Sequence, residues 1–186
     1  MGKLIYSMLV SLDGYARGPD GNFDWAEPDD VTHTFINQRA REIGTCLLGR
    51  EMYNVMVFWE TVLAERDLPP AYREYAEIWQ GQEKIVYSTT LTEVASERTR
   101  IEREFDPEAV RALKASSELD ISIDGPTLAH QAVRAGLVDE YAVYVCAAVA
   151  GGGLRFWPDD VRLDLELLEE QALGSGIVFM RYRERA

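Results

Sequence analysis

Segment 118–141 constrains the fold of this chain more than any other stretch, because it contains a strand, a tight turn, a helix and the next strand with almost no residues between them. The turn is 124–127. Pro126 suits the first helical position, where no N–H is needed and φ is already helical. Gly136 suits the left-handed residue that ends such a helix. A strand, a helix and a strand in succession are typical of a parallel sheet covered by helices.

The same pattern recurs along the chain. We expect strands at 4–12, 46–48, 84–87, 101–105, 121–123 and 141–149, with a closing hairpin of 162–173 and 177–182. We expect helices from Pro28 to Gly44, through 53–56, from Pro69 to Trp79, after Asp106 and at 126–135, with a polar connection at 60–68. The predicted fold is a single-domain α/β protein of three layers, α/β/α, with a mostly parallel sheet and a C-terminal antiparallel hairpin.

Length and charge limit the possible functions. The 186 residues are enough for one sizeable core, so we expect one domain over 1–186. The net charge is −13 and there is no basic cluster, which argues against nucleic acid and anionic membrane as partners. The longest apolar run, 141–154, is too short and too rich in glycine to span a bilayer.

The few cysteines and histidines point to a reducing compartment and to no metal site. Cys46 and Cys146 each lie in an apolar strand-like run and are expected to be buried free thiols, which suits the cytoplasm. Together with His33 and His130 they give no metal-ligand spacing. The N-terminus has no signal-peptide pattern.

Small or polar residues follow each of four predicted strands. The pairs are Asp13-Gly14, Gly49-Arg50, Ser88-Thr89 and Asp124-Gly125. In an open parallel sheet such strand ends line one crevice, where nucleotides bind, and the first N–H groups of a following helix can hold an anion. The alternative is that these are ordinary turns, with Arg50 in a surface salt bridge to Glu51.

Several motifs in fixed order resemble a known family. They are SLDG at 11–14, Trp25-x-x-Pro28-x-Asp30, LLGR at 47–50 followed by Tyr53, KIVYS at 84–88, DGPTLAHQAVRAGLVDEY at 124–141, and Gly151-Gly152-Gly153 followed by Arg155-Phe156. The chain resembles the dihydrofolate reductase fold, and more closely the reductase domain at the C-terminal end of the bacterial riboflavin-biosynthesis deaminase-reductase, without a deaminase half. The resemblance covers nearly the whole chain.

The resemblance implies an NADPH-dependent reductase acting on a small molecule, a ribosylaminopyrimidine-like or pteridine-like compound. It implies that the adenosine phosphates of the cofactor lie against Gly49, Arg50, Ser88 and Thr89, and that the diphosphate lies against Gly125, Pro126, Thr127 and Leu128. The candidate catalytic acids are Asp30, which dihydrofolate reduction favours, and Asp13, which reduction of a ribosylamino group favours. The candidate substrate-binding residues are Trp25, Gly152 and Arg155. Relatives of this type look dimeric, so we expect a homodimer in which 141–149 and the hairpin pair.

Three positions depart from the family pattern. Family members often have a basic residue and a threonine after Gly-Arg, whereas this chain has Glu51 and Met52. Glu51 would repel a 2′-phosphate by about 1 kcal/mol, so NADH is also a candidate cofactor. Asp124 replaces the first of two glycines and puts a carboxylate near the expected diphosphate. These departures leave two alternatives: a nucleotide-binding or sensing protein without chemistry, and an interaction module that uses the aromatic loop 23–25.

Overall fold

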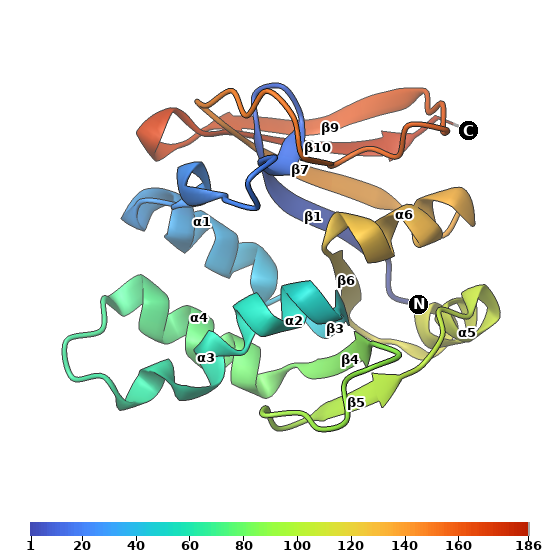
Figure 1. Ribbon diagram of the computed structural model, residues 1–186, viewed down its shortest axis with the longest axis horizontal. Coiled ribbons are helices and arrows are strands. Elements are labelled where there is room, and N and C mark those ends of the chain that lie inside the picture. The colour runs from blue at the N-terminus through green and yellow to red at the C-terminus, as the bar shows by residue number, and fades with distance from the viewer. Residues whose placement is uncertain (186) are drawn as a thin grey trace.

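An eight-stranded sheet runs through the computed structural model, which describes residues 1–185 (Figure 1). The strand order is β5-β4-β3-β6-β1-β7-β10-β9. The strands are β1 (Leu4–Ser11), β3 (Ile43–Gly49), β4 (Glu83–Tyr87), β5 (Thr99–Glu102), β6 (Asp120–Asp124), β7 (Glu140–Cys146), β9 (Leu165–Ala172) and β10 (Val178–Glu184). The strands from β5 to β7 pair in parallel, and β10 is antiparallel to both β7 and β9. The predicted mostly parallel sheet with an antiparallel C-terminal hairpin is confirmed.

Helices cover both faces of this sheet, which confirms the three predicted layers. They are α1 (Asp30–Ala40), α2 (Arg50–Met56), α3 (Phe58–Thr61), α4 (Pro70–Gly81), α5 (Pro107–Ser116) and α6 (Pro126–Arg134). Short 3-10 turns lie at Asp24–Ala26, Val62–Ala64 and Gly174–Gly176. No helix within residues 1–185 has both the length and the apolar character needed to cross a bilayer.

The junction of β6 and α6 forms as the sequence predicts. Gly125 precedes the helix with φ of 92°, a left-handed conformation that favours glycine, and Pro126 takes the first helical position. The helix ends before Gly136, which has φ of 60°. These two glycines let the chain turn sharply at each end of α6, so that β6 and β7 lie on either side of β1.

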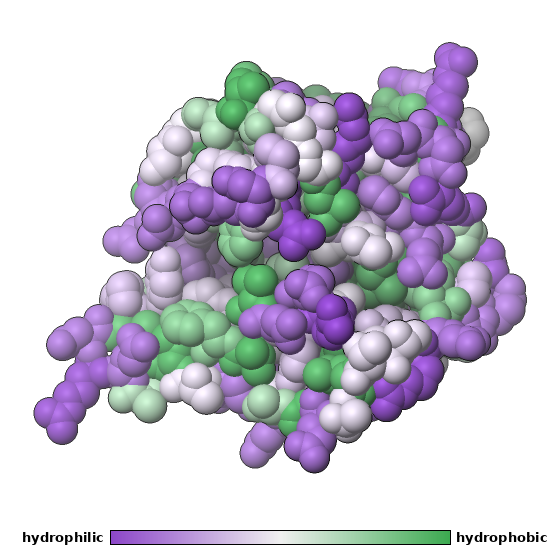
Figure 2. Space-filling view, viewed as in Figure 1, coloured by the Kyte–Doolittle hydropathy of each residue, from purple (hydrophilic) through white to green (hydrophobic). Residues whose placement is uncertain are grey.

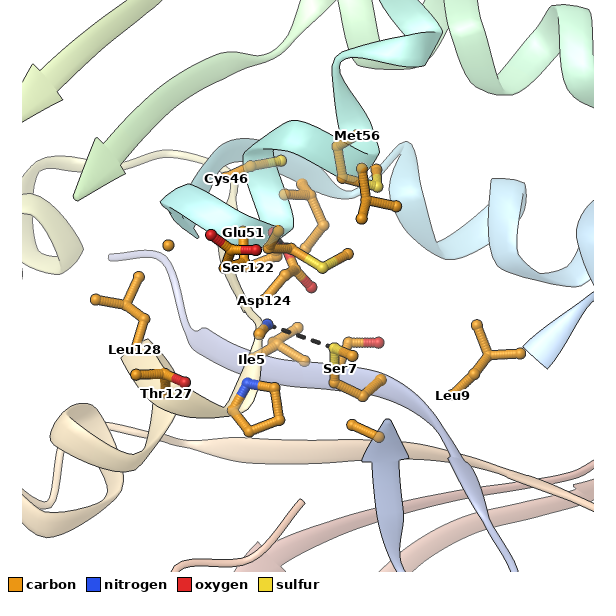
Figure 3. Close-up of a pocket in the computed structure, with 18 of the residues that line it drawn as sticks. Ile5, Ser7, Leu9, Cys46, Glu51, Met56, Ser122, Asp124, Thr127 and Leu128 are labelled. Carbon is orange, nitrogen blue, oxygen red and sulfur yellow. Dashed lines mark hydrogen bonds between the residues drawn. The ribbon is translucent and has the colours of Figure 1, made fainter. Parts of the chain in front are cut away.

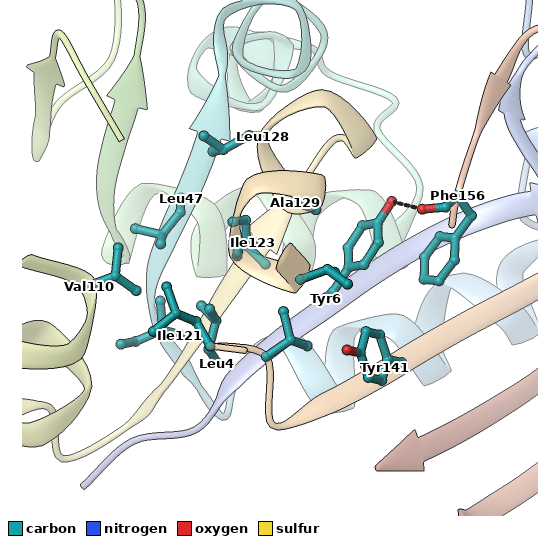
Figure 4. Packing of buried hydrophobic residues seen from close by; sticks show 14 of the residues in the cluster. Leu4, Tyr6, Leu47, Val110, Ile121, Ile123, Leu128, Ala129, Tyr141 and Phe156 are labelled. Carbon is teal, nitrogen blue, oxygen red and sulfur yellow. Dashed lines mark hydrogen bonds between the residues drawn. The ribbon is translucent and has the colours of Figure 1, made fainter. Parts of the chain in front are cut away.

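The main hydrophobic core lies between the sheet and the α5–α6 layer (Figure 4). Leu4, Tyr6, Ile121 and Ile123 point into it from β1 and β6 and have no exposed surface. The Tyr6 ring stacks on Phe156 with 4.1 Å between centroids, and its hydroxyl donates to the Phe156 carbonyl oxygen at 3.0 Å. Each such fully buried side chain contributes about 1.5–3 kcal/mol to folding, so this face fixes the sheet.

The opposite face of the sheet is covered by two separate clusters. One contains Phe35, Ala142, Tyr144, Cys146, Ile177 and Phe179. The other contains Cys46, Leu48, Tyr53, Trp79 and Val86. Between the clusters lie the central strands β1 and β6, whose side chains on this face are therefore not fully covered.

Several boundaries differ from the prediction. The prediction extended two strands to Leu12 and Val149, but β1 ends at Ser11 and β7 ends at Cys146. Leu12 and Val149 are 68% and 73% exposed, so their apolar character did not indicate that they belong to a strand. α1 ends at Ala40, and Gly44 lies inside β3. The polar connection predicted at 60–68 contains the end of α3 and a 3-10 turn.

Two pairing features were not predicted. A small second sheet joins β2 (Tyr15–Arg17) to β8 (Leu154–Arg155). β7 lies between β1 and β10. Both edges of β7 are therefore occupied within the chain, β9 is the exposed edge of the hairpin, and the expected homodimer stays a prediction.

The glycine triplet allows a direct stability test. A Cβ at Gly153, where φ is 112°, would lie 2.1 Å from the Arg17 carbonyl oxygen, whereas a Cβ at Gly151 would meet open space. We expect Gly153→Ala to lower the free energy of unfolding by about 3 kcal/mol or more. Gly151→Ala, with φ of 73°, should cost only about 1 kcal/mol. Urea unfolding of both variants tests this, and equal midpoints would contradict the packing of β2 against β8.

Candidate functional site

A cavity of about 1120 Å³ opens between the two clusters on the second face of the sheet. Figure 2 shows the surface hollowed between the part that carries α1 and the part that carries α2 and α4. Its floor is made by alternate residues of the central strands (Figure 3). These are Ile5, Ser7 and Leu9 from β1, Cys46 from β3, and Ser122 and Asp124 from β6.

Aromatic side chains form one wall of the cavity. His33, Trp59, Tyr75 and Trp79 line it from α1, α3 and α4. The His33 ring stacks on Tyr72 with 4.5 Å between centroids, and Trp59 packs against Tyr75 at 4.8 Å. Burial lowers the pKa of His33 because it disfavours the charged imidazolium. A flat apolar ligand would therefore find an aromatic, uncharged wall here.

All of the residues predicted to bind the cofactor line this one cavity. They are Gly49, Arg50, Ser88, Thr89, Gly125, Pro126, Thr127 and Leu128. No side chain caps the N-terminus of α6, so the N–H groups of its first turn have no acceptor from a capping residue. The Gly125 N–H donates to Met8 Sδ at 3.4 Å. The arrangement fits an anionic group at this helix end, and the binding roles of these residues stay predictions.

Arg50 and Ser88 also make the local contacts that the sequence offered as alternatives. Arg50 donates from Nε and one terminal nitrogen to Glu51 Oε1 at 3.2 and 2.9 Å, and from the other terminal nitrogen to Thr90 Oγ1 at 2.9 Å. Ser88 Oγ accepts from the N–H groups of Thr90 and Leu91, as in an ordinary turn. Arg50 thus lies at the cavity with an acidic partner that a phosphate would have to replace.

Asp124 does not block the start of α6. Its Oδ2 accepts from Ser122 Oγ at 2.7 Å rather than from the helix N–H groups. The side chain is half-buried on the cavity floor, and burial raises the pKa of its carboxyl group to about 7, although the Ser122 bond opposes this. From the sequence, Asp124 was interpreted only as a carboxylate that would weaken diphosphate binding. Ser122 lies two residues earlier and therefore on the same face of the strand, and this spacing could have predicted a polar cavity floor.

Asp30 lies outside the cavity. Its side chain is exposed at the start of α1 and borders a separate shallow depression with Val31, Thr34 and Gln38. The residue before it, Asp29, caps α1 by accepting from the Thr32 N–H. Asp30 is therefore not enclosed by the cavity, and its role as a catalytic acid stays a prediction.

Asp13 holds a loop together. Its carboxylate accepts from the N–H groups of Ala150 and Gly151 at 2.9 and 2.8 Å and from Ser11 Oγ at 2.7 Å. These bonds stabilise the ionised form, and the pKa of Asp13 falls to about 2. Asp13 does not line the cavity. Its observed contacts are those of a residue that fixes the glycine triplet.

The three predicted substrate residues also lie outside the cavity. Trp25 is half-buried against the cluster that contains Phe35. Gly152 is in the loop after β7, and Arg155 pairs with Asp159 at 3.3 Å while its guanidinium covers the Tyr15 ring at 5.0 Å. The structure thus brings together the predicted cofactor residues but neither the predicted catalytic acids nor the predicted substrate residues.

Known proteins share both the sequence pattern and the fold. Protein YyaP of Bacillus subtilis (strain 168), described only as uncharacterized, is 28% identical over 184 residues, which cover 97% of this chain and 94% of YyaP. A diaminohydroxyphosphoribosylaminopyrimidine deaminase/5-amino-6-(5-phosphoribosylamino)uracil reductase from Thermotoga maritima is similar in structure, with a TM-score of 0.68, 12% identity, and coverage of 99% of this chain and 57% of that chain.

The fold is also that of dihydrofolate reductase. The enzyme from Enterococcus faecalis, complexed with NADP(H), has a TM-score of 0.63 and 14% identity over 100% of this chain and 98% of its own. The profile of the family described as RibD C-terminal domain matches residues 2–179. These matches confirm the resemblance inferred from the motifs, and the chain belongs to the RibD C-terminal domain family.

Proposed function

We propose that this protein is an NAD(P)H-dependent reductase that transfers hydride to a ribosylaminopyrimidine-like or pteridine-like substrate, of the 5-amino-6-(5-phosphoribosylamino)uracil reductase type. The observation that carries the proposal is that every residue predicted for the cofactor lines one cavity beside the uncapped start of α6. Membership of the RibD C-terminal domain family supports the same reaction class.

The chain's own contribution would be binding and orientation. The free N–H groups at the start of α6 favour a diphosphate, both as donors and through the helix dipole. Gly49 has no side chain where a phosphate would come close, and Arg50 offers a fork of donors. The bound cofactor supplies the hydride. The floor of Ile5 and Leu9 and the aromatic wall would keep water from the reacting atoms.

The positions of the two candidate acids do not decide the substrate. Dihydrofolate reduction was the alternative that needed Asp30 as a buried acid, and Asp30 is exposed outside the cavity. Asp13, which reduction of a ribosylamino group favours, also lies outside the cavity, so the ribosylaminopyrimidine type is supported by family membership and not by the position of either acid. We further propose that the enzyme acts in the cytoplasm on a free small molecule, and as a homodimer.

Cofactor binding is the first test. Trp59 and Trp79 line the cavity, so a bound dinucleotide should change tryptophan fluorescence. We expect saturable binding of NADPH, with NADH within about tenfold because Glu51 already pairs with Arg50. Side-by-side fluorescence titrations measure both constants. Absence of binding of either dinucleotide at millimolar concentration would contradict the proposed function.

Position 49 offers a matched test of where the phosphates bind. Gly49 precedes α2 with φ of −71° and no side-chain cap, and a Cβ there would make only an ordinary 3.7 Å contact with Leu128. Aspartate and asparagine are both good N-caps, so both variants should fold. We expect Gly49→Asp to bind NADPH at least about tenfold more weakly than Gly49→Asn, because only aspartate adds a negative charge. Equal affinities would place the phosphates elsewhere.

A further inference from the structure

Asp124 is an acid on the cavity floor without a cationic partner among the residues that the structure describes. Its Oδ2 accepts the bond from Ser122 Oγ at 2.7 Å, and within residues 1–185 it forms no ion pair. Its Oδ1 has no hydrogen-bond partner among these residues. A half-buried carboxyl group without a cation has lost part of its solvation, which a hydrogen-bond donor can replace. A ligand in the cavity can supply that donor.

The other acids around the cavity are in a different position. Of the four that line it within residues 1–185, Glu42, Glu51 and Glu104 are exposed to bulk solvent. Only Asp124 is half-buried, and it lies on the floor rather than at the rim (Figure 3). Asp124 is therefore the acidic group best placed to select a ligand that enters deeply.

The surroundings of Asp124 suit a planar ligand. Beside it on the floor are the hydroxyl groups of Ser7 and Ser122 and the aliphatic side chain of Ile5. Trp59 and Tyr75 belong to the aromatic wall of the same cavity. A flat ring between floor and wall would bury its faces against apolar atoms and turn one polar edge toward the carboxyl group.

We propose that Asp124, supported by Ser122, binds the amino-bearing edge of a nitrogen heterocycle and is the substrate-recognition acid that sequence reasoning sought at Asp30 or Asp13. The identification of this heterocycle as the substrate rests on the proposed function. The recognised chemistry is an amino group next to a ring nitrogen, as in a 2-aminopyrimidine.

Each protonation state of the carboxyl group matches a different ring edge. A carboxylate accepts two hydrogen bonds, so it pairs with a ring N–H and the adjacent amino group, as in 2-aminopyrimidin-4(3H)-one. A neutral carboxyl group donates once and accepts once, so it pairs with a bare ring nitrogen and the adjacent amino group, as in 2-aminopyrimidine. 2-Aminopyrimidin-4(3H)-one also has a bare N1 beside its amino group and can pair with either state, whereas 2-aminopyrimidine, whose two ring nitrogens are both bare, pairs with the neutral carboxyl group alone.

Burial favours the neutral forms of the cysteine, tyrosine and histidine side chains around Asp124. Burial raises the pKa of Cys46 on β3 to about 12 and raises those of three tyrosine hydroxyls. These tyrosines are Tyr6 on β1, Tyr75 on α4 and Tyr144 on β7. Burial favours neutral His33 on α1. The other charged groups that line the cavity within residues 1–185 are Arg17, Arg39, Glu42, Arg50, Glu51, Arg103, Glu104 and Arg181.

Binding of the two compounds at pH 6 and pH 8, on either side of the Asp124 pKa of about 7, tests the proposal. Neither compound titrates in this range. We expect 2-aminopyrimidin-4(3H)-one to bind more tightly at pH 8, by up to about tenfold, because its two hydrogen bonds to a carboxylate are charge-assisted and the carboxylate fraction rises about tenfold. 2-Aminopyrimidine should show the opposite change. Isothermal titration calorimetry measures all four constants.

Three variants make the result specific. Asp124→Asn should bind 2-aminopyrimidin-4(3H)-one at least about tenfold more weakly at pH 8 and show no pH dependence with either compound. Ser122→Ala removes the bond that favours the carboxylate, so the opposing pH dependences should persist but shift to higher pH. Glu42→Gln, which alters an exposed cavity acid without a role in the proposed site, should behave as the unchanged protein.

Two results would overturn the assignment. One is equal affinity of the unchanged protein and Asp124→Asn for 2-aminopyrimidin-4(3H)-one at pH 8. The other is loss of NADPH affinity in Asp124→Asn with heterocycle affinity retained, which would assign Asp124 to the cofactor. Failure of the proposed function is distinguishable: heterocycle binding that depends on Asp124, in a protein that binds no dinucleotide, leaves this inference standing and removes the reductase.

Discussion

The sharp turn at Gly125 is the constraint on which the rest of the structure depends. Only a residue without a Cβ takes φ of 92° here without strain, and a side chain would also press on Met52. The turn sends α6 back over one face of the sheet, where Tyr6, Ile121 and Ile123 build the main core. It also leaves the first N–H groups of α6 at the edge of the cavity.

The cavity exists because the second face of the sheet is covered in two parts. α1 packs over β7 and β10, α4 packs over β3 and β4, and neither covers the central strands. The floor between them can therefore carry polar residues, as Ser7, Ser122 and Asp124 do, without disturbing either cluster. Stability and ligand binding are thus assigned to opposite faces of one sheet.

The sequence predicted what depends on local pattern. β-branched strands, Pro126 and Gly136 marked the β6–α6–β7 unit, and glycine or hydroxyl residues after strands marked the cofactor side of the cavity. It could not predict which way the loop side chains face. Asp13 turns to the backbone of the glycine triplet, and Asp30 turns to solvent. The orientation of Asp13 follows from contacts with residues more than a hundred positions away, and that of Asp30 from its place in the first turn of α1, neither of which spacing alone encodes.

The pairing of Arg50 with Glu51 has a consequence for how fast anionic ligands arrive. The two side chains together present a dipole, not a positive charge, at the mouth of the cavity. A molecule with a net charge of −13 then repels a dinucleotide at long range, and the lining arginines without an ion pair among residues 1–185, Arg17 and Arg103, attract it only close to the cavity. Dissolved salt screens that repulsion within about 10 Å at 0.1 M. Association should accelerate with ionic strength, the reverse of the behaviour of enzymes that guide anions through a basic funnel.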